Sequence, residues 1–177
     1  MSNNSAKLLV FAAEQLACIK ITGRANFTSS LDFKTLVQEL SDKGTTCFVL
    51  DLSECVLMDS TFLGVLSGFG LKMSAAREPS SGRSIELLNP NPRIAELLEN
   101  LGVLHLFKVV EGTSPELAKD ACEHVPVVGP ERTREEITSN CLEAHKILMA
   151  IDPANVSKFK EVTQFLAEDL KKLKSTP

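Results

Sequence analysis

Short apolar runs and helical patterns alternate along the first two thirds of the chain. Runs of strand length predict β-strands at residues 7–11, 16–22, 47–52, 84–88 and 105–110. Between them, apolar residues spaced by three and four predict helices that begin near Ser29, after Ser60 and at Pro92, and Ser114-Pro115 opens a further short helix that reaches Cys122. Two strands followed by alternating helices and strands predict an α/β fold, in which helices flank a largely parallel sheet.

Residues that favour helix ends support these boundaries. Ser29 and Ser30 offer N-caps to the first helix, and Gly44 follows it where a helix often ends in glycine. Asn91 and Pro92 form an N-cap and first-turn pair for the third helix. Turn chemistry therefore predicts the same helix limits as periodicity does.

The last third of the chain has a different pattern. After the turn-forming sequence HVPVVGPE, Thr133 and Glu136 fit a capping box, and Asp152-Pro153 separates two helical patterns. We therefore expect an α/β domain over residues 1–125 and a helical hairpin over residues 126–177. The apolar stripes of its two helices hold Ile137, Cys141, Ala144, Leu148 and Ile151, and then Phe159, Val162, Leu166, Leu170 and Leu173.

These stripes require a surface that covers them. If all of them stayed in water, the chain would expose more apolar area than monomeric proteins usually tolerate. The stripes can pack against the α/β domain or against a second copy of the chain. We expect a homodimer through the hairpin, because the domain has helices enough to cover both faces of its sheet.

Composition and charge exclude several classes of function. The 177 residues are 44% hydrophobic and carry a formal net charge of −4, so the chain lacks the basic balance that binding to nucleic acid or anionic membrane requires. The five cysteines are odd in number and form no CxxC pair, which favours a reduced, cytoplasmic protein. The apolar run at residues 8–13 is too short for a secretory signal or a membrane span, so we expect no membrane insertion.

The segment DLSECVLMDSTFLGVLSGFG, residues 51–70, contains the main candidate site. Ser60 lies where a strand has ended and a helix begins, at the edge of a parallel sheet where functional residues usually gather. One side of that helix carries almost no bulky groups near Ser60 and could admit a protein surface closely; it is formed by Ser60, Gly64, Ser67, Gly68 and Leu71. Two alternatives stay open: Ser60 is a simple N-cap, or the smooth side packs against another part of the same chain.

The sequence lacks the patterns of common catalytic and ligand sites. The α/β-hydrolase elbow needs glycine two residues before and after the serine, where this chain has Met58 and Phe62. The contexts of His105, His124 and His145 are typical of surface or core residues. No cluster has metal-ligand spacing, and no GxxxxGK[ST] or GxGxxG motif occurs. We therefore expect no catalytic residue, no metal, no cofactor and no enzymatic activity.

The same segment resembles the signature of the STAS domain, the family of anti-sigma factor antagonists. The matching residues follow the order Asp-Leu-Ser, a short linker, Asp-Ser-Ser/Thr and then Leu-Gly; they are Asp51, Leu52, Ser53, Asp59, Ser60, Thr61, Leu63 and Gly64. The resemblance runs from about residue 7 to residue 122 and implies a mixed, mostly parallel sheet flanked by helices. Phe62 departs from the pattern, because many relatives have glycine there. The hairpin after Pro130 lies outside the common domain.

The resemblance implies a regulatory protein-binding module in a phosphorylation-controlled partner-switching pathway that acts on transcription. In this family, the serine that matches Ser60 is phosphorylated, and Thr61 is the fallback acceptor here. The unphosphorylated surface binds an anti-sigma factor of the histidine-kinase-like ATPase fold that is itself the serine kinase, and a PP2C-type phosphatase completes the cycle. The expected partner-binding residues are Asp59, Ser60, Thr61, Gly64, Ser67 and Gly68.

A second interpretation of the same resemblance is a constitutive scaffold. In that case, the chain is the STAS subunit of a lipid-transport ATPase or of a stress-signalling complex, and Ser60 only caps its helix.

Overall fold

The computed structural model describes residues 5–75, 82–112 and 125–176. The described residues form the following elements. In chain order they are β1 (Lys7–Ala13), β2 (Leu16–Ala25), α1 (Phe27–Asp42), β3 (Cys47–Asp51), β4 (Cys55–Met58), α2 (Ser60–Ala75), β5 (Ser84–Leu88), α3 (Pro92–Asn100), the 3-10 turn η1 (Leu104–Leu106), β6 (Lys108–Val110), β7 (Val125–Pro126), α4 (Arg134–Ile151) and α5 (Ala154–Ser175).

The strands form a mixed sheet in the order β6-β5-β3-β2-β1-β7, and β4 pairs with the end of β2. β1 runs antiparallel to both of its neighbours, whereas the β2–β3, β3–β5 and β5–β6 pairs are parallel. The predicted α/β fold with a mixed, mostly parallel sheet is therefore confirmed. Because β3 and β4 are both parallel to β2, the chain enters α2 at the carboxyl edge of these strands.

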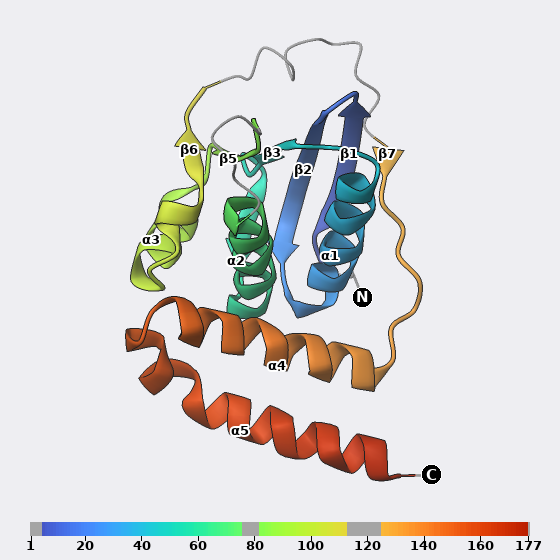
Figure 1. Cartoon of the computed structure of the whole chain (residues 1–177), viewed down its shortest axis with the longest axis vertical. Helices are drawn as coiled ribbons and strands as arrows, with labels where there is room; N and C mark the ends of the chain where they lie inside the picture. The colour runs from blue at the N-terminus through green and yellow to red at the C-terminus, as the bar shows by residue number, and fades with distance from the viewer. Residues whose placement is uncertain (1–4, 76–81, 113–124, 177) are drawn as a thin grey trace.

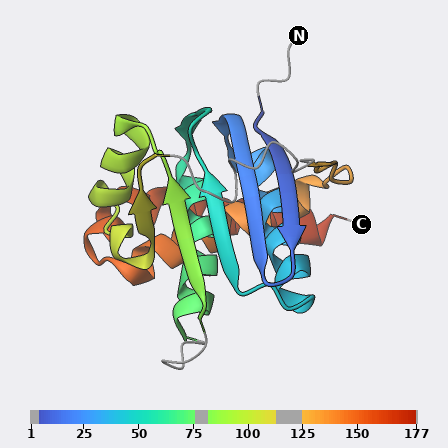
Figure 2. The same ribbon diagram turned by 90° about the horizontal axis from the view of Figure 1, so that it is seen from above.

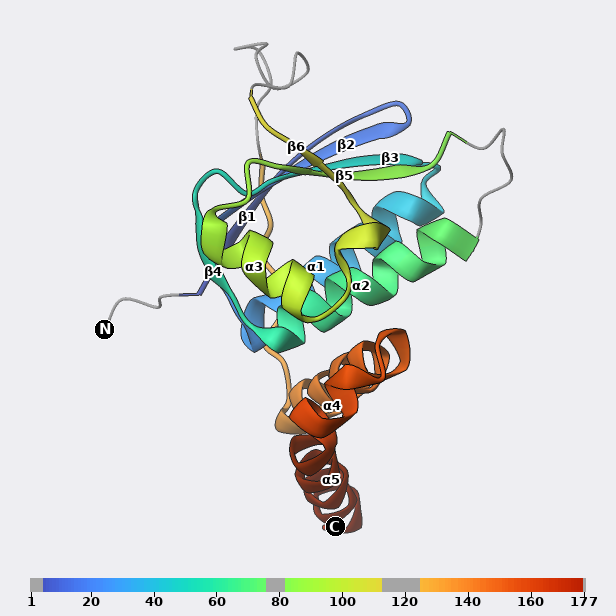
Figure 3. The same ribbon diagram turned by 90° about the vertical axis from the view of Figure 1, so that its left-hand side faces the viewer.

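The helices are stacked in layers on one side of the sheet, below it in Figure 3, and α4 and α5 lie at the bottom of Figure 1. α1, α2 and α3 form the layer next to the sheet; α4 crosses below α1 and α2, and α5 lies on the far side of α4. In the view from above, α1 and α2 lie behind the strands (Figure 2). Within the described residues the helices thus lie on one side of the sheet, and the expectation of helices on both faces is wrong for this part of the chain.

The main core lies between the sheet and the helices. Alternation along β2 sends Ala17, Ile19 and Ile21 into this core, where each is fully buried. α4 belongs to the same core, since it contributes Ala144 and Leu148. A smaller cluster of Cys18, Val49 and Leu88 lies on the opposite face of the sheet. The hairpin therefore shares its hydrophobic core with the α/β domain.

Several predicted boundaries are confirmed. β5 has its predicted limits, Asn91 caps α3 through a 2.9 Å bond from the Ile94 amide, and Pro92 is the first residue of that helix. Thr133 and Glu136 form the predicted capping box at the start of α4. The cap residues thus predict the starts of α3 and α4.

Other boundaries differ from the prediction. α1 is capped by Asn26, and Ser29 is its partner in a capping box, so neither Ser29 nor Ser30 is the N-cap. Only residues 108–110 of the predicted strand at 105–110 pair with β5, because Leu104–Leu106 form a 3-10 turn. The short strands β4 and β7 were not predicted. The predicted helix from Ser114 to Cys122 lies outside the described residues.

Candidate functional site

Asp59, not Ser60, caps α2. The Asp59 carbonyl accepts the first intrahelical bond from the Leu63 amide at 3.0 Å, and its Oδ1 accepts a bond from the Phe62 amide at 2.8 Å. These are the two contacts that define an N-cap residue. Ser60 is the first residue of the helix, so its hydroxyl is not needed to cap it. The interpretation of Ser60 as a simple N-cap is therefore wrong.

The Asp59 carboxylate also ties α2 to α1. Its Oδ2 accepts a bond from the Phe27 amide, the first amide of α1, at 2.8 Å. Burial raises the pKa of the Asp59 carboxyl above its usual range, and the hydrogen bonds from Phe62 and Phe27 act against this shift. Asp59 thus fixes the relative position of two helix N-termini beside Ser60.

The Ser60 hydroxyl is bonded to a histidine of the hairpin. Ser60 Oγ lies 2.9 Å from His145 Nε2, and His145 Nδ1 lies 2.7 Å from the carbonyl oxygen of Cys141. A carbonyl can only accept, so Nδ1 must carry a proton. In the neutral ring Nε2 is then the acceptor, and the Ser60 hydroxyl donates to it. The Phe159 ring of α5 packs on the imidazole with centroids 5.0 Å apart.

This Ser–His pair differs from a hydrolase triad. In a triad, a carboxylate accepts the Nδ1 proton and stabilises the imidazolium that forms during catalysis. Here a backbone carbonyl takes that place. The nearby Asp59 carboxylate is already bonded to two backbone amides. The pair holds the Ser60 hydroxyl in one orientation and joins α2 to α4.

α4 covers the smooth side of α2. A Cβ atom built on Gly64 would contact the backbone of Ala144, and one built on Gly68 would lie 2.8 Å from Ile147 Cδ1. On another side of the helix, a Cβ on Gly70 would lie 3.1 Å from the Phe107 ring. Gly64 therefore lets the backbone of α4 approach α2 closely, whereas Gly68 and Gly70 make room for side chains of Ile147 and Phe107. In this conformation the smooth side packs against the same chain.

The other predicted partner-binding residues share this burial. Thr61 is 5% exposed and Ser67 is fully buried, whereas Asp59 and Ser60 are half-buried. The structure therefore brings Asp59, Ser60, Thr61 and Gly64 together at the first turns of α2, where α4 contacts Ser60 through His145 and Gly64 through Ala144. α4 thus covers Gly64, whereas Asp59 and Ser60 keep part of their surface exposed.

Polar contacts hold α4 and the segment before it to α1. Asn140 Nδ2 donates to Ser30 Oγ at 2.9 Å in a buried bond, and Lys34 pairs with Glu143 at 2.7 Å on the surface. Arg132 donates to Thr35 Oγ1 at 3.1 Å. The turn of the hairpin is held to the end of α3, where Asn155 Nδ2 donates to the Leu101 carbonyl at 2.9 Å. The hairpin is thus anchored at both ends of α4.

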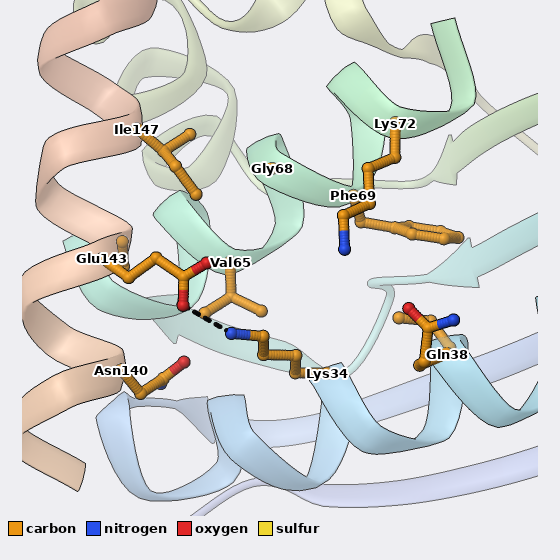
Figure 4. Close-up of a pocket in the computed structure, with 11 residues that line it drawn as sticks. Lys34, Gln38, Val65, Gly68, Phe69, Lys72, Asn140, Glu143 and Ile147 are labelled. Carbon is orange, nitrogen blue, oxygen red and sulfur yellow. Dashed lines mark hydrogen bonds and ion pairs between the residues drawn. The ribbon is translucent and has the colours of Figure 1, made fainter. Parts of the chain in front are cut away.

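A cavity remains where α1, α2 and α4 meet (Figure 4). Its volume is about 80 Å³, and it is lined by Val65 and Phe69 of α2 and by Ile147 of α4. Lys72 and the Lys34–Glu143 ion pair also line it (Figure 4). Asn140 Oδ1 also lines this region and has no hydrogen-bond partner among the described residues. The packing of α4 on the domain is therefore incomplete here.

His145 is the functional-site residue that sequence reasoning missed. It lies 85 residues from Ser60 along the chain, so no local motif connects them. A signal was present, because His145 adjoins the apolar stripe of α4 between Ala144 and Leu148 and is 6% exposed. A polar residue beside a buried stripe requires a buried hydrogen-bond partner.

Across the ranges that the structure covers, no three histidine, cysteine or acidic side chains come together as a metal site would require. In the same ranges, no helix has the length and apolar character needed to cross a membrane. These findings concern the described residues alone.

Comparison with solved structures supports the fold. The anti-sigma factor antagonist SpoIIAA in its unphosphorylated form is 18% identical with a TM-score of 0.53, over 62% of this chain and 90% of that one. SpoIIAA of Bacillus in its phosphorylated form is 18% identical with a TM-score of 0.50, over 62% and 94%. An anti-sigma factor antagonist from Mycobacterium paratuberculosis is 14% identical with a TM-score of 0.51, over 66% and 93%.

The family comparison concerns the sequence itself. No curated protein sequence matches the chain. The family described as Mlab, STAS domain matches residues 10–111, which is more than half of the 177 residues and includes the whole Asp59–Ser60 segment. The hairpin lies beyond the matched residues. On this match, supported by the sheet order and the site geometry, the chain belongs to the STAS domain family.

Proposed function

We propose that the chain is an anti-sigma factor antagonist whose binding is controlled by phosphorylation of Ser60. The observation that carries this proposal is the division of roles at the start of α2. Asp59 makes both capping contacts, which leaves the Ser60 hydroxyl free of any structural duty within its own helix. Thr61, the fallback acceptor, is 5% exposed and thus less accessible than Ser60. The structural likeness to anti-sigma factor antagonists supports the same function.

Phosphorylation at this position would change the surface more than the fold. A phosphoserine adds about −1.5 to −2 charges at neutral pH. The N-terminus of a helix tolerates negative charge, because its free amides and its dipole are positive. The added charge would stand beside the Asp59 carboxylate and make the surface strongly anionic. Phosphorylation of Ser60 is therefore expected to act on binding.

The proposed partners follow from the family. The unphosphorylated chain binds an anti-sigma factor of the histidine-kinase-like ATPase fold, which phosphorylates Ser60, and a PP2C-type phosphatase removes the phosphate. No basic surface for nucleic acid is part of this proposal, since the net charge is −4. The chain is proposed to act in the cytoplasm, as its odd number of cysteines and the lack of a CxxC pair favour.

Affinity capture with phosphorylation variants tests this function. Ser60→Ala and Ser60→Asp baits are exposed to a native cell extract, and the captured proteins are identified by mass spectrometry. We expect an ATPase of the histidine-kinase-like fold on Ser60→Ala and at least about tenfold less of it on Ser60→Asp, since like charge at an interface costs over 1.4 kcal/mol. Equal capture by the two baits would reject the phosphorylation switch.

The second candidate is the constitutive scaffold. One observation favours it: the Ser60 hydroxyl already has a bond partner, His145, and so can serve the hairpin contact alone. In that case, both baits capture the same transporter or signalling subunits, and Ser60 carries no phosphate.

A further inference from the structure

We propose that the C-terminal hairpin is a built-in competitor for the partner of α2: α4 occupies the partner-binding surface in the free chain, and it must leave before Ser60 can be phosphorylated or a partner can bind. This inference rests on the proposed function of the Ser60 surface. In this proposal the chain has two conformations. In the closed state α4 is docked on α2, and in the open state α4 has left α2 while the STAS domain stays folded.

The closest contact of the hairpin lies in the middle of the proposed partner surface. Ala144 lies against Gly64 so closely that even a methyl group on Gly64 would meet the α4 backbone. Ile147 covers Gly68 one turn further along. No second protein can share this surface with α4, because the two helices already touch at backbone distance. Binding to Gly64 and Gly68 therefore requires the open state.

The hydroxyl of Ser60 also makes a hydrogen bond that exists only in the closed state. His145 Nε2 lies 2.9 Å from Ser60 Oγ, which is a full hydrogen bond. A phosphoryl group would place a phosphorus atom and three oxygens on this Oγ, beside a ring that is 6% exposed and held by the Phe159 ring. The 2.9 Å separation leaves no room for a phosphoryl group between Ser60 Oγ and His145 Nε2, so the phosphorylated side chain loses this contact. Phosphorylation of Ser60 thus requires the open state, and once it has occurred it also favours that state.

The docked interface has features of a contact that can separate. The cavity between α1, α2 and α4 and the unpartnered Asn140 Oδ1 both reduce the free energy of docking. Residues 127–133, which connect β7 to α4, form no helix or strand. Opening would expose Ala144 and Leu148, so the closed state prevails in the free chain. A partner that covers the same face offsets this cost.

The contact also indicates which partner surface fits. α4 presents a helix with a small residue, Ala144, at its closest approach to Gly64, and an apolar side chain, Ile147, over Gly68. A competitor has to approach α2 equally closely. We therefore infer that the partner presents a helix with alanine, glycine or serine at the position that faces Gly64.

Hydrogen exchange of the full wild-type chain tests the open state. We expect the amides of α4 to exchange at least about tenfold faster, relative to their intrinsic rates, than the amides of β3, because the hairpin opens while the sheet stays folded. Equal protection of α4 and β3 would overturn the proposal.

A pair of matched variants then tests the competition. Ala144→Glu places a charge against Gly64, whereas Ala150→Glu places the same charge on the exposed side of the same helix. Both full-length variants and the wild type are incubated with native extract and ATP, and phosphate on Ser60 is measured over time. We expect Ala144→Glu to be modified roughly 10- to 1,000-fold faster than wild type, the inverse of an open population of about 0.1–10%. Ala150→Glu should match wild type.

The two experiments separate the two claims. If Ala144→Glu is modified at the wild-type rate, the hairpin is not a competitor, and the inference falls while the proposed function stands. If hydrogen exchange shows the open state but no variant gains phosphate on Ser60, the proposed function is rejected. The proposed competition between α4 and a partner is then rejected as well, because it rests on that function. If Ala144→Glu does not fold, hydrogen exchange of the wild type still decides whether the hairpin opens.

Discussion

Two neighbouring residues, Asp59 and Ser60, have opposite roles at the start of α2. The Asp59 carboxylate is bonded to amides of its own helix and of α1, so it holds the STAS domain together at this edge. The Ser60 hydroxyl is bonded outside the domain, to His145 of the hairpin. A change at Asp59 should therefore affect folding first, and a change at Ser60 should affect the docking of other helices first.

Replacement of Asp59 tests its role in stabilising the fold. Asp59→Ala removes a helix cap and leaves the Phe27 amide without its acceptor, so we expect the free energy of unfolding to fall by about 2 kcal/mol. Urea denaturation measures this change. Asp42→Ala, at an exposed site near the end of α1, is the control and should change stability by less than about 0.5 kcal/mol. If the two variants are equally stable, Asp59 is not the cap that the geometry indicates.

Two glycine substitutions test the contact between α2 and α4. Gly64→Ala places a methyl group against the backbone of Ala144, which cannot move alone, so overpacking should cost about 1–3 kcal/mol or undock α4. Gly68→Ala meets only the flexible end of Ile147, and the better helix propensity of alanine should offset that contact. Thermal unfolding of both variants gives the comparison. A Gly68→Ala variant that melts lower than Gly64→Ala would contradict the observed packing.

At the scale of elements, α4 depends on the capping box at its start. The Thr133 amide and hydroxyl hold the Glu136 carboxylate and lower the pKa of this side chain. A lowered pKa in the folded state means that the stabilisation is complete above the unfolded pKa of about 4.3 and is lost as the pH falls through the folded value. We expect Glu136→Ala to lower the melting temperature at pH 7, and the difference from wild type to vanish in acid. A difference that stays constant with pH would exclude this role of the carboxylate.

The elements also show what the sequence could and could not predict. α3 and α4 were predicted because cap residues and periodic apolar positions agree there, and β5 because its apolar run follows a segment rich in turn formers. β4 and β7 have four and two residues, too few to show a period. The Ser60 position follows from the local pattern, but its contact with His145 does not, because the docking of α4 depends on contacts between residues far apart in the chain. The sequence therefore predicted the position of Ser60 at the start of α2, and it left open whether another part of the same chain covers the smooth side.

At the scale of the whole molecule, the hairpin has one packed helix and one outer helix. α4 shares the domain core, whereas α5 lies on α4, away from the sheet (Figure 3). On α5, Phe165 is 66% exposed and Val162 is 37% exposed. The expected burial of the stripes is thus met for α4 within the chain and is incomplete for α5.

The outer face of α5 is where we predict the homodimer to form. Phe165→Ser should convert a dimer into a monomer, because it removes the largest exposed apolar side chain of this helix. Lys171→Ser, also exposed on α5, is the control and should leave the mass unchanged. Light scattering of the purified full-length proteins gives the masses. A wild-type chain that is monomeric at all concentrations would show that α5 mediates no self-association.

Mapping phosphate on the chain purified from its native cells tests the central claim most directly. Intact mass and peptide mapping give the fraction of molecules that carry one phosphate and its position. We predict a single phosphate on Ser60 in part of the population, none on Thr61, and faster hydrogen exchange of α4 in the phosphorylated fraction. A chain without phosphate on Ser60 under every growth condition, or a phosphorylated chain with α4 as protected as in the unmodified one, would contradict it.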